Sequence, residues 1–385
     1  ADLYGVQGLT TEALELIERT EDAAEEHHWT AVAADAYRSH ARLLLERGDP
    51  VRASFLFRQA LCRFDELHER VRVAVCLVGL AECAREQGDM VGASRFSRRA
   101  RALYRQLNHI RGQADCCLTL AQIARRLVDP ESAVKLVEAA LELYKKDGCE
   151  QGIANCLRSL GLLHVSSDPN RAAALYERAR GIVEKIGHRQ NEGRILNDIA
   201  DLARMQGDLD GAEAGYRKAL TLCEATGSGD ATVLRINLGL VLIARGEYQE
   251  AQRLLHRCRE DLVAAGRHLF LGGVHANLLP CVAAHRDWTT WDFHFDEAVS
   301  FITRTNLIEL DDTWTVQLAG DLALAAGELE RARKAYRFAR HLWQKLGDSR
   351  RVLELDGVLE QLGVSSSADA VADAPGTGYL PAASF

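Results

Sequence analysis

The stretch LGLVLIARGEYQEAQRLLHRC, residues 238–258, decides the fold of this 385-residue chain. Two small residues, Gly239 and Ala251, lie twelve positions apart, and Gly246-Glu247 stands between them. Glycine supplies the left-handed backbone that ends a helix, and an acidic residue suits the start of the next one. The stretch therefore predicts two helices folded back on one another about a Gly-Glu turn.

The same pattern returns about every 40 residues along the chain. The alanine at 251 belongs to a series that only Trp291 interrupts: Ala13, Ala53, Ala93, Ala133, Ala172, Ala212, Ala251 and Ala332. A second series of small residues precedes it by about twelve positions: Ala41, Ala81, Ala121, Gly161, Ala200, Gly239 and Gly320. Small side chains let two helices approach closely. An interval of this length is typical of a solenoid built from repeated helical hairpins.

Turn residues occur at the same interval. Glycine followed by an acidic residue separates the two helices of five units, at 48–49, 88–89, 207–208, 246–247 and 327–328. In three units the turn contains Asp-Pro, at 49–50, 129–130 and 168–169. Aspartate caps a helix, and proline suits its first position. These signals predict where each second helix begins.

The repeated unit resembles the tetratricopeptide repeat. The match is Leu-Gly or Leu-Ala within the first helix, a Gly-Asp turn, and then Ala, Tyr or Phe, and Ala along the second helix. The resemblance covers about residues 10–345, with units near 40 residues rather than 34. It implies an all-α, right-handed solenoid. We expect an orphan second helix of a truncated repeat at 1–28, eight hairpins over 29–346, a capping helix at 347–363 and a flexible tail at 364–385.

Composition narrows the function classes. The chain is 47% hydrophobic and 26% charged, which is typical of a folded protein. Its net charge of −8 disfavours a general attraction to nucleic acid or to an anionic membrane. We find no apolar run of about 18 residues and no signal peptide. The ten cysteines form no Cys-x-x-Cys motif and are expected to be reduced and structural, in a cytoplasmic protein.

No catalytic or metal motif is complete. The tripeptide His285-Arg286-Asp287 spells a kinase catalytic loop, but the other kinase motifs are missing. His268, His275, His285 and His294 are spaced by 7, 10 and 9 residues, whereas metal-binding histidines on a helix favour a spacing of four. We therefore expect a protein that is not an enzyme and that uses no cofactor and no metal.

The resemblance implies that the first helices line a concave groove. On this sequence the polar candidates for binding a partner there are Arg38, Arg42, Gln122, Arg125, Asn155, Arg158, Arg194, Asn197 and Arg204. Asn197 and Arg158 resemble the Asn and Arg that clamp a peptide backbone or carboxylate in peptide-binding members. Arginine presents a planar fork that suits carboxylates and phosphates. Alternatively, these charges pair with one another across adjacent helices.

The later first helices are apolar, with Val233, Ile236, Leu240 and Ile243 at groove positions. Such a strip either contacts a partner or is buried because those units close more tightly. Pro280 is expected to kink or split its helix.

The next unit is the most irregular of the array. Trp288 and Trp291 are candidate contacts for a partner. The alternative is a bend in the solenoid that these aromatic residues pack.

The expected function is a non-enzymatic scaffold that binds a protein or peptide, with an acidic segment as one option. Residues 285–345 resemble the end of large bacterial signalling regulators of the serine/threonine-kinase or STAND type. The array would then be the recruiting or sensory arm of such a protein. The alternative is a sensor array, regulated by a ligand or by its own tail, that controls a linked effector domain. The oligomeric state stays open.

Overall fold

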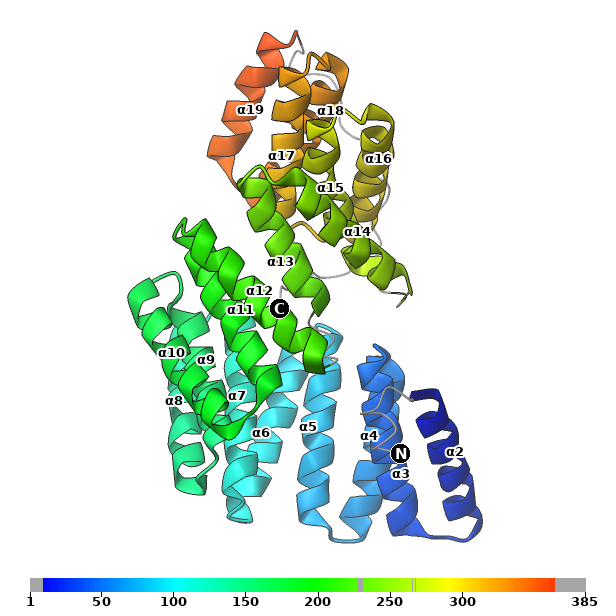
Figure 1. The fold of residues 1–385 in the computed structure, drawn as a ribbon. Coiled ribbons are helices and arrows are strands. Elements are labelled where there is room, and N and C mark those ends of the chain that lie inside the picture. The colour runs from blue at the N-terminus through cyan, green and yellow to red at the C-terminus, as the bar shows by residue number, and fades with distance from the viewer. Residues whose placement is uncertain (1–9, 227–230, 265, 267, 364–385) are drawn as a thin grey trace. The chain divides into compact units, whose positions relative to one another are not determined.

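The structure is a computed structural model that describes residues 10–226, 231–264, 266 and 268–363. Within these residues the chain forms 18 α-helices and one short 3₁₀ helix, with no strand (Figure 1). The all-α solenoid expected from the sequence is confirmed. The expected tail at 364–385 and the first nine residues of the expected orphan helix lie outside the described residues.

The chain divides into two compact units, of which the first ends at Ile186. Unit 1 contains an initial helix and four helical hairpins. Its helices are α2 (Thr10–Glu26), α3 (Thr30–Glu46), α4 (Pro50–Glu66), α5 (Arg70–Glu86), α6 (Met90–Gln106), α7 (Ile110–Arg126), α8 (Pro130–Asp147), α9 (Glu150–His164) and α10 (Pro169–Ile186). Each odd-numbered helix packs most extensively on the even-numbered helix that follows it. We call the odd-numbered members the first helices and the even-numbered members the second helices.

Unit 2 begins at Gly187 and contains four further hairpins and a last helix. Its helices are α11 (Arg189–Met205), α12 (Leu209–Thr226), α13 (Ala231–Ala244), α14 (Tyr248–Ala264), η1 (His268–Phe270), α15 (Leu271–Ala284), α16 (Trp288–Thr305), α17 (Leu310–Ala325), α18 (Leu329–Leu346) and α19 (Ser349–Gln361). The last helix, α19, packs on α18.

The turn chemistry expected from the sequence is confirmed. Asp49 and Asp129 cap α4 and α8, since their carboxylates accept hydrogen bonds from the backbone N–H of Arg52 and Ser132 at 3.0 and 3.1 Å. Gly48, like the other glycines of the Gly-acid turns, has a left-handed backbone, with φ of +80°. Val128 takes the same conformation without glycine's freedom, at φ of 58°.

The alanine series forms the contact layer between helices. Its described members are fully buried: Ala53, Ala93, Ala133, Ala172, Ala212, Ala251 and Ala332, each 0% exposed. At Gly161 the space is filled by the ring of Tyr176, because a Cβ added there would lie 2.4 Å from the ring carbon Cε1. The repeat period of the sequence is thus a packing constraint.

All ten cysteines are free thiols. Eight of them are buried, Cys149 is half-buried and Cys62 is exposed. Burial raises the pKa of the Cys76 and Cys281 thiols to about 12. Most of the thiols therefore serve as small apolar side chains.

Of the two outcomes expected for Pro280, a kinked or a split helix, the split is wrong. Helix α15 continues as a single α-helix through Pro280, so the proline does not split it. The missing N–H of Pro280 leaves the carbonyl of Ala276 without its usual helical donor. Most of α15 is buried, Pro280 included, so that neighbouring helices hold this stretch in place.

Candidate functional site

The structure divides the predicted partner-binding residues between the two units. Unit 1 holds Arg38, Arg42, Gln122, Arg125, Asn155 and Arg158. Unit 2 holds Arg194, Asn197, Arg204, Trp288 and Trp291.

The polar side chains of α3 are largely engaged within unit 1. A guanidinium nitrogen of Arg38 lies 3.5 Å from the carboxylate of Asp35, and Arg72 of α5 reaches the same carboxylate at 2.8 Å. Arg42 is half-buried on the same helix. At this end of the unit, the pairing of charges across adjacent first helices is what the structure shows.

Three arginines gather farther along, on α5 and α7. We call Arg85, Arg125 and Arg126 the α5–α7 arginine cluster. Burial, followed by the positive charge of Arg85, lowers the pKa of Arg126. Arg85 forms an ion pair with Glu86 at 2.9 Å, yet its Nε–H is buried and has no hydrogen-bond partner among the described residues. The cluster is thus a place where positive charge exceeds its described partners.

The remaining candidates of unit 1 extend from this cluster. Gln122 is exposed on α7 and lies one helical turn before Arg126. Asn155 and Arg158 lie half-buried on α9 and make interactions within the structure. Their side chains are therefore already engaged within the protein.

In unit 2, Asn197 belongs to a polar network. Its side-chain N–H donates to Asp201 at 2.8 Å, and its carbonyl accepts from Asn237 at 3.1 Å. The Tyr216 hydroxyl donates to the other oxygen of Asp201. Burial raises the pKa of Asp201. A peptide clamp at Asn197 would therefore have to break or share these bonds.

Arg204 makes the longest-range contact of the network. Its guanidinium donates to Asp311 of α17 at 2.9 Å, across 107 residues of sequence. Burial opposes the charge of Arg204, but the hydrogen bond and charge of Asp311 raise its pKa overall. Arg194, on the same helix, is exposed. An ion pair between helices three hairpins apart means that the first helices of unit 2 converge.

The apolar first-helix residues of unit 2 lie mostly inside this convergence. Leu240 is 4% exposed, Ile243 1% and Ala276 0%. Helix α15 packs extensively on α17 as well as on its own partner α16. Of the two alternatives that the sequence left open, tighter closure is the one observed, although Val233 at the helix start is still 42% exposed.

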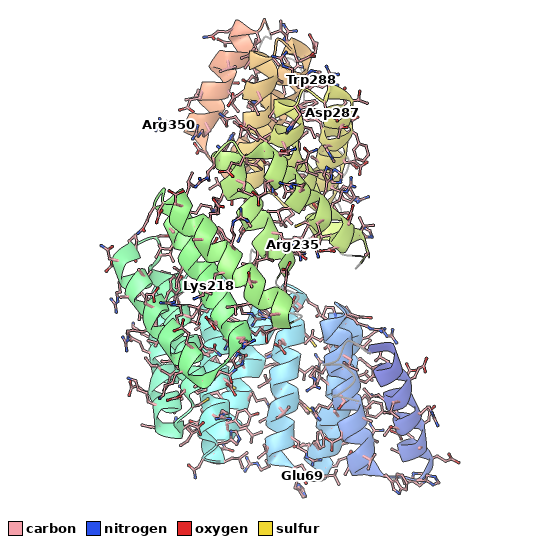
Figure 2. The ribbon with its side chains drawn as sticks, in the orientation of Figure 1. Glu69, Lys218, Arg235, Asp287, Trp288 and Arg350 are labelled. Carbon is pink, nitrogen blue, oxygen red and sulfur yellow. The ribbon has the colours of Figure 1, made fainter. Side chains whose placement is uncertain are left out.

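The two candidate tryptophans of α16 do not form an open contact surface. Trp291 is 0% exposed and stacks on Phe295 with ring centroids 5.0 Å apart, so a partner cannot reach it. Trp288, labelled in Figure 2, is half-buried. The Arg331 guanidinium lies 5.6 Å from its ring centroid. The aromatic residues pack the irregular unit, because Trp291 fills the space that alanine leaves elsewhere.

Several residues of this network were not singled out from the sequence. Asn237 follows Asn197 by one 40-residue repeat, so the repeat spacing could have revealed it. Asp311 carries no such signal. Arg235, labelled in Figure 2, is 6% exposed and is held by Glu224 at 2.8 Å and Asp261 at 2.7 Å.

Two buried histidines face one another in unit 2. The Nδ1 atoms of His275 and His294 lie 2.9 Å apart, and His294 is 1% exposed. Burial lowers the pKa of His275 to about 4 and that of His294 to about 3. Among the described residues no group of three potential ligands is placed to hold a metal ion.

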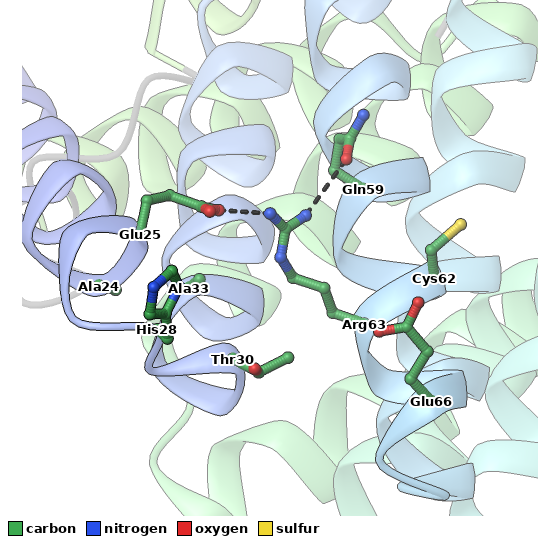
Figure 3. A pocket seen from close by; sticks show the side chains of 9 residues that line it. All are labelled: Ala24, Glu25, His28, Thr30, Ala33, Gln59, Cys62, Arg63 and Glu66. Carbon is green, nitrogen blue, oxygen red and sulfur yellow. Dashed lines mark hydrogen bonds and ion pairs between the residues drawn. The ribbon is translucent and has the colours of Figure 1, made fainter.

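Two pockets of unit 1 repeat the same geometry. The first, of about 380 Å³, is lined by residues of α2, α3 and α4, and the ion pair between Arg63 and Glu25 crosses it (Figure 3). The second, of about 280 Å³, lies one repeat later. Every residue that lines the second pocket follows a residue that lines the first by 40 positions. The pockets are a property of the stacked hairpins.

Comparison with known proteins supports this architecture. Residues 191–262 match the family model of the tetratricopeptide repeat. The match covers α11 to α14, and the other described hairpins repeat the same pairing of helices. No curated protein matches the chain at a significant level.

Solved structures share the fold at low sequence identity. A Rap protein complexed with competence and sporulation factor is 13% identical, with a TM-score of 0.60 over 89% of this chain and 99% of its own. A STAND protein with a tetratricopeptide repeat sensor from Pyrococcus horikoshii is 14% identical, with a TM-score of 0.57 over 86% of this chain and 54% of its own. A chain of the Cut9–Hcn1 hetero-tetramer is 16% identical, with a TM-score of 0.55 over 80% of this chain and 54% of its own. At these identities the likeness concerns the fold.

A search of the described residues for membrane spans finds no helix with the length and apolar character to cross a bilayer.

Proposed function

We propose that this chain is a scaffold that binds an acidic segment of a protein or peptide through the α5–α7 arginine cluster. The observation that carries the proposal is the excess positive charge at Arg85, Arg125 and Arg126. Burial is the largest cause of the lowered pKa of Arg126, and the positive charge of Arg85 is the second. A carboxylate that joined the cluster would relieve this repulsion and would give Arg85 Nε–H an acceptor. Arg125, Arg126 and Gln122 lie on one helix, so a bound segment would follow α7.

The fold supports a binding role rather than a chemical one. Tetratricopeptide-type arrays present side chains from rigid helices and are generally non-catalytic. The Rap protein that shares this fold is complexed with competence and sporulation factor. We extend the proposal to the chain's setting: it serves as the recruiting or sensory arm of a larger signalling protein, as the tetratricopeptide repeat sensor of the STAND protein suggests.

The test is a binding measurement with two matched variants. A fluorescein-labelled Glu-rich peptide is titrated with the wild-type chain, with Arg125→Ala/Arg126→Ala and with Arg171→Ala/Arg178→Ala. The control arginines are exposed on α10 of the same unit and form no ion pair with the described residues. We expect the cluster variant to weaken binding about tenfold or more, which is ~1.4 kcal/mol, and the control to change it less than twofold. Equal affinity of both variants and the wild type would reject the cluster as the binding site.

A further inference from the structure

A second charged surface lies on the other side of the hairpin, on the second helix α6. This helix carries five arginines and no acidic residue: Arg95, Arg98, Arg99, Arg101 and Arg105. Val91, Arg95, Arg98, Ala102 and Arg105 are separated by four, three, four and three positions, so they follow one face of the helix. All five positions are exposed, and so is Arg99 beside them. The opposite face is the buried one, with Ala93, Ser97, Ala100 and Tyr104.

The charge of this α6 arginine face is not balanced within the described structure. None of the five arginines of α6 forms an ion pair with a described residue. Some exposed arginines of unit 1 are paired, as Arg111 is with Asp147 at 3.0 Å, and others are not, as Arg171 and Arg178 on α10. Helix α6 differs in that it carries no paired arginine and no acidic residue. In a chain with a net charge of −8, the four exposed arginines on and beside this face, Arg95, Arg98, Arg99 and Arg105, are a local surplus of positive charge, while Arg101 is half-buried.

Exposed apolar side chains occur on the same face and at the corresponding positions one repeat earlier, since Val51 and Phe55 precede Val91 and Arg95 by 40 positions. Val91, at the start of the face, is 79% exposed, and on the neighbouring second helix Val51 and Phe55 are 68% and 61% exposed. Phe96 of α6 connects the two helices, since its ring lies 5.7 Å from the Arg58 guanidinium of α4 and 5.3 Å from that of Arg95. Exposed aromatic and aliphatic groups beside arginines are the composition that protein interfaces favour.

The two repeated pockets differ in charge, although their lining positions correspond. In the pocket of Figure 3, the positions 30, 59 and 66 are Thr, Gln and Glu, whereas one repeat later they are Arg70, Arg99 and Gln106. The second pocket keeps one acidic residue, Asp65, so it contains two arginines against one carboxylate. It opens beside Ala102 and can receive an anionic side chain at the centre of the face.

The width of the surface decides between the possible polyanions. The next second helix, α8, presents exposed Glu131, Lys135, Glu138, Glu142 and Lys145 one repeat after the five positions of the α6 face, so the surplus of positive charge does not continue there. A nucleic acid duplex or a membrane surface is wider than one helix and would meet these carboxylates. An extended or helical peptide is narrow enough to remain on α6, and the ~15 Å between Arg95 and Arg105 suits a short segment. Arginine forks pair well with carboxylates.

We infer that the α6 arginine face is a docking surface for an acidic segment of a separate protein, with apolar side chains in that segment contacting Val91, Val51 and Phe55. The surface is distinct from the α5–α7 arginine cluster, because it uses the exposed face of a second helix. The inference therefore stands or falls independently of the function proposed above.

The experiment measures fluorescence anisotropy of four labelled probes with the full chain. The probes are a 16-residue peptide of Glu and Leu with helical spacing, a 16-residue poly-Glu peptide, a 20-base single-stranded DNA and vesicles that contain phosphatidylserine. The variants are Arg98→Glu/Arg99→Glu and the milder Arg98→Gln/Arg99→Gln. The matched control is Arg171→Glu/Arg178→Glu on α10, which makes the same change of charge in the same unit, and circular dichroism checks that every variant folds.

We expect the Glu-Leu peptide to bind more tightly than poly-Glu, and its affinity to fall with salt. The Arg→Glu pair should lower the affinity at least tenfold, the Arg→Gln pair about threefold, and the control less than twofold. The same affinity for wild type and Arg98→Glu/Arg99→Glu would overturn the inference. So would tighter binding of DNA or vesicles, the absence of peptide binding at millimolar concentration, or peptide binding that requires deletion of residues 364–385, which would assign the surface to the chain's own end.

Discussion

Units 1 and 2 use the same helical hairpin in different ways. In unit 1, the first helices α3, α5, α7 and α9 place arginines and polar residues where their neighbours leave them half-buried or exposed. In unit 2, α13 and α15 place aliphatic residues at the corresponding positions, α15 packs on α17, and Arg204 reaches Asp311. The composition of the first helix therefore decides whether a hairpin array keeps a face available for a partner or packs that face against itself.

The largest expected effect on unit 2 comes from replacing Trp291. Trp291→Ala removes a fully buried ring that stacks on Phe295, and we expect unit 2 to lose about 3–5 kcal/mol of unfolding free energy through the cavity left behind. Four of the five tryptophans, at 288, 291, 314 and 343, lie in unit 2. Urea unfolding followed by tryptophan fluorescence in a Trp29→Phe background therefore reports on this unit. Leu353→Ala, at a side chain 71% exposed, is the control and should change the free energy by less than about 0.5 kcal/mol.

Acid should weaken unit 2 through its buried histidines. The pKa values of His275 and His294 are lowered to about 4 and about 3, so the unfolded chain takes up protons near pH 6.5 while the folded chain does not. The contribution of the two neutral histidines to the unfolding free energy is fully present above about pH 6.5 and is lost as the pH falls toward 4. Between pH 8 and pH 5 we expect a loss of about 2–4 kcal/mol, measured by urea unfolding in an Asp312→Asn background. A His275→Gln/His294→Gln variant that lost as much would contradict this assignment.

Asp312 should act in the opposite direction. Burial, followed by the charges of Glu309 and Asp311, raises the pKa of Asp312 to about 7, and its carboxylate occupies the space where Gly273 lacks a Cβ. A raised carboxyl pKa means that folding favours the protonated form, so this contribution is complete below about pH 4 and is lost as the pH rises to 7. Asp312→Asn should therefore stabilise unit 2 by about 1–3 kcal/mol at pH 8 and by little at pH 5. Equal unfolding free energies of variant and wild type at pH 8 would show that the carboxylate is better solvated than its position indicates.

The smallest expected effect concerns the contact that spans unit 2. Arg204→Ala should destabilise this unit by about 1–2 kcal/mol, because the ion pair with Asp311 is only partly exposed and its loss leaves a carboxylate behind. A double-mutant cycle with Asp311→Ala should recover a coupling energy of about 1 kcal/mol. Hydrogen exchange should speed up in α11 and α17 of the single variant. Unchanged exchange would mean that apolar packing alone holds the first helices of unit 2 together.

The fold could be predicted from the sequence because the residues that specify the solenoid act locally. The alanine series, the Asp-Pro caps and the turn glycines each act within one hairpin, and all appear in the structure where the sequence places them. Even the failure of the register at Trp291 pointed to the irregular unit. The continuous helix through Pro280 was not foreseen, since the packing that surrounds it comes from other hairpins.

The contacts of the candidate site were harder to predict from the sequence. A comparison of adjacent repeats relates positions about 40 residues apart, and it would have linked Asn197 to Asn237. It could not link Arg204 to Asp311, 107 residues away, because that contact depends on how several apolar helices close together. It also treated the arginines of the first helices as a series, whereas the structure separates the paired Arg38 from the cluster around Arg126.

The buried thiols have a practical consequence for the study of this protein. Eight cysteines distributed over both units are shielded, and the raised pKa of most of them suppresses the reactive thiolate. An alkylating reagent should modify the exposed Cys62 first and the half-buried Cys149 next, and should reach the eight buried cysteines only when their own hairpin opens. Mass spectrometry of the labelled peptides would then measure how fast each cysteine-containing hairpin from α5 to α15 opens, so that the native cysteines serve as probes of local unfolding.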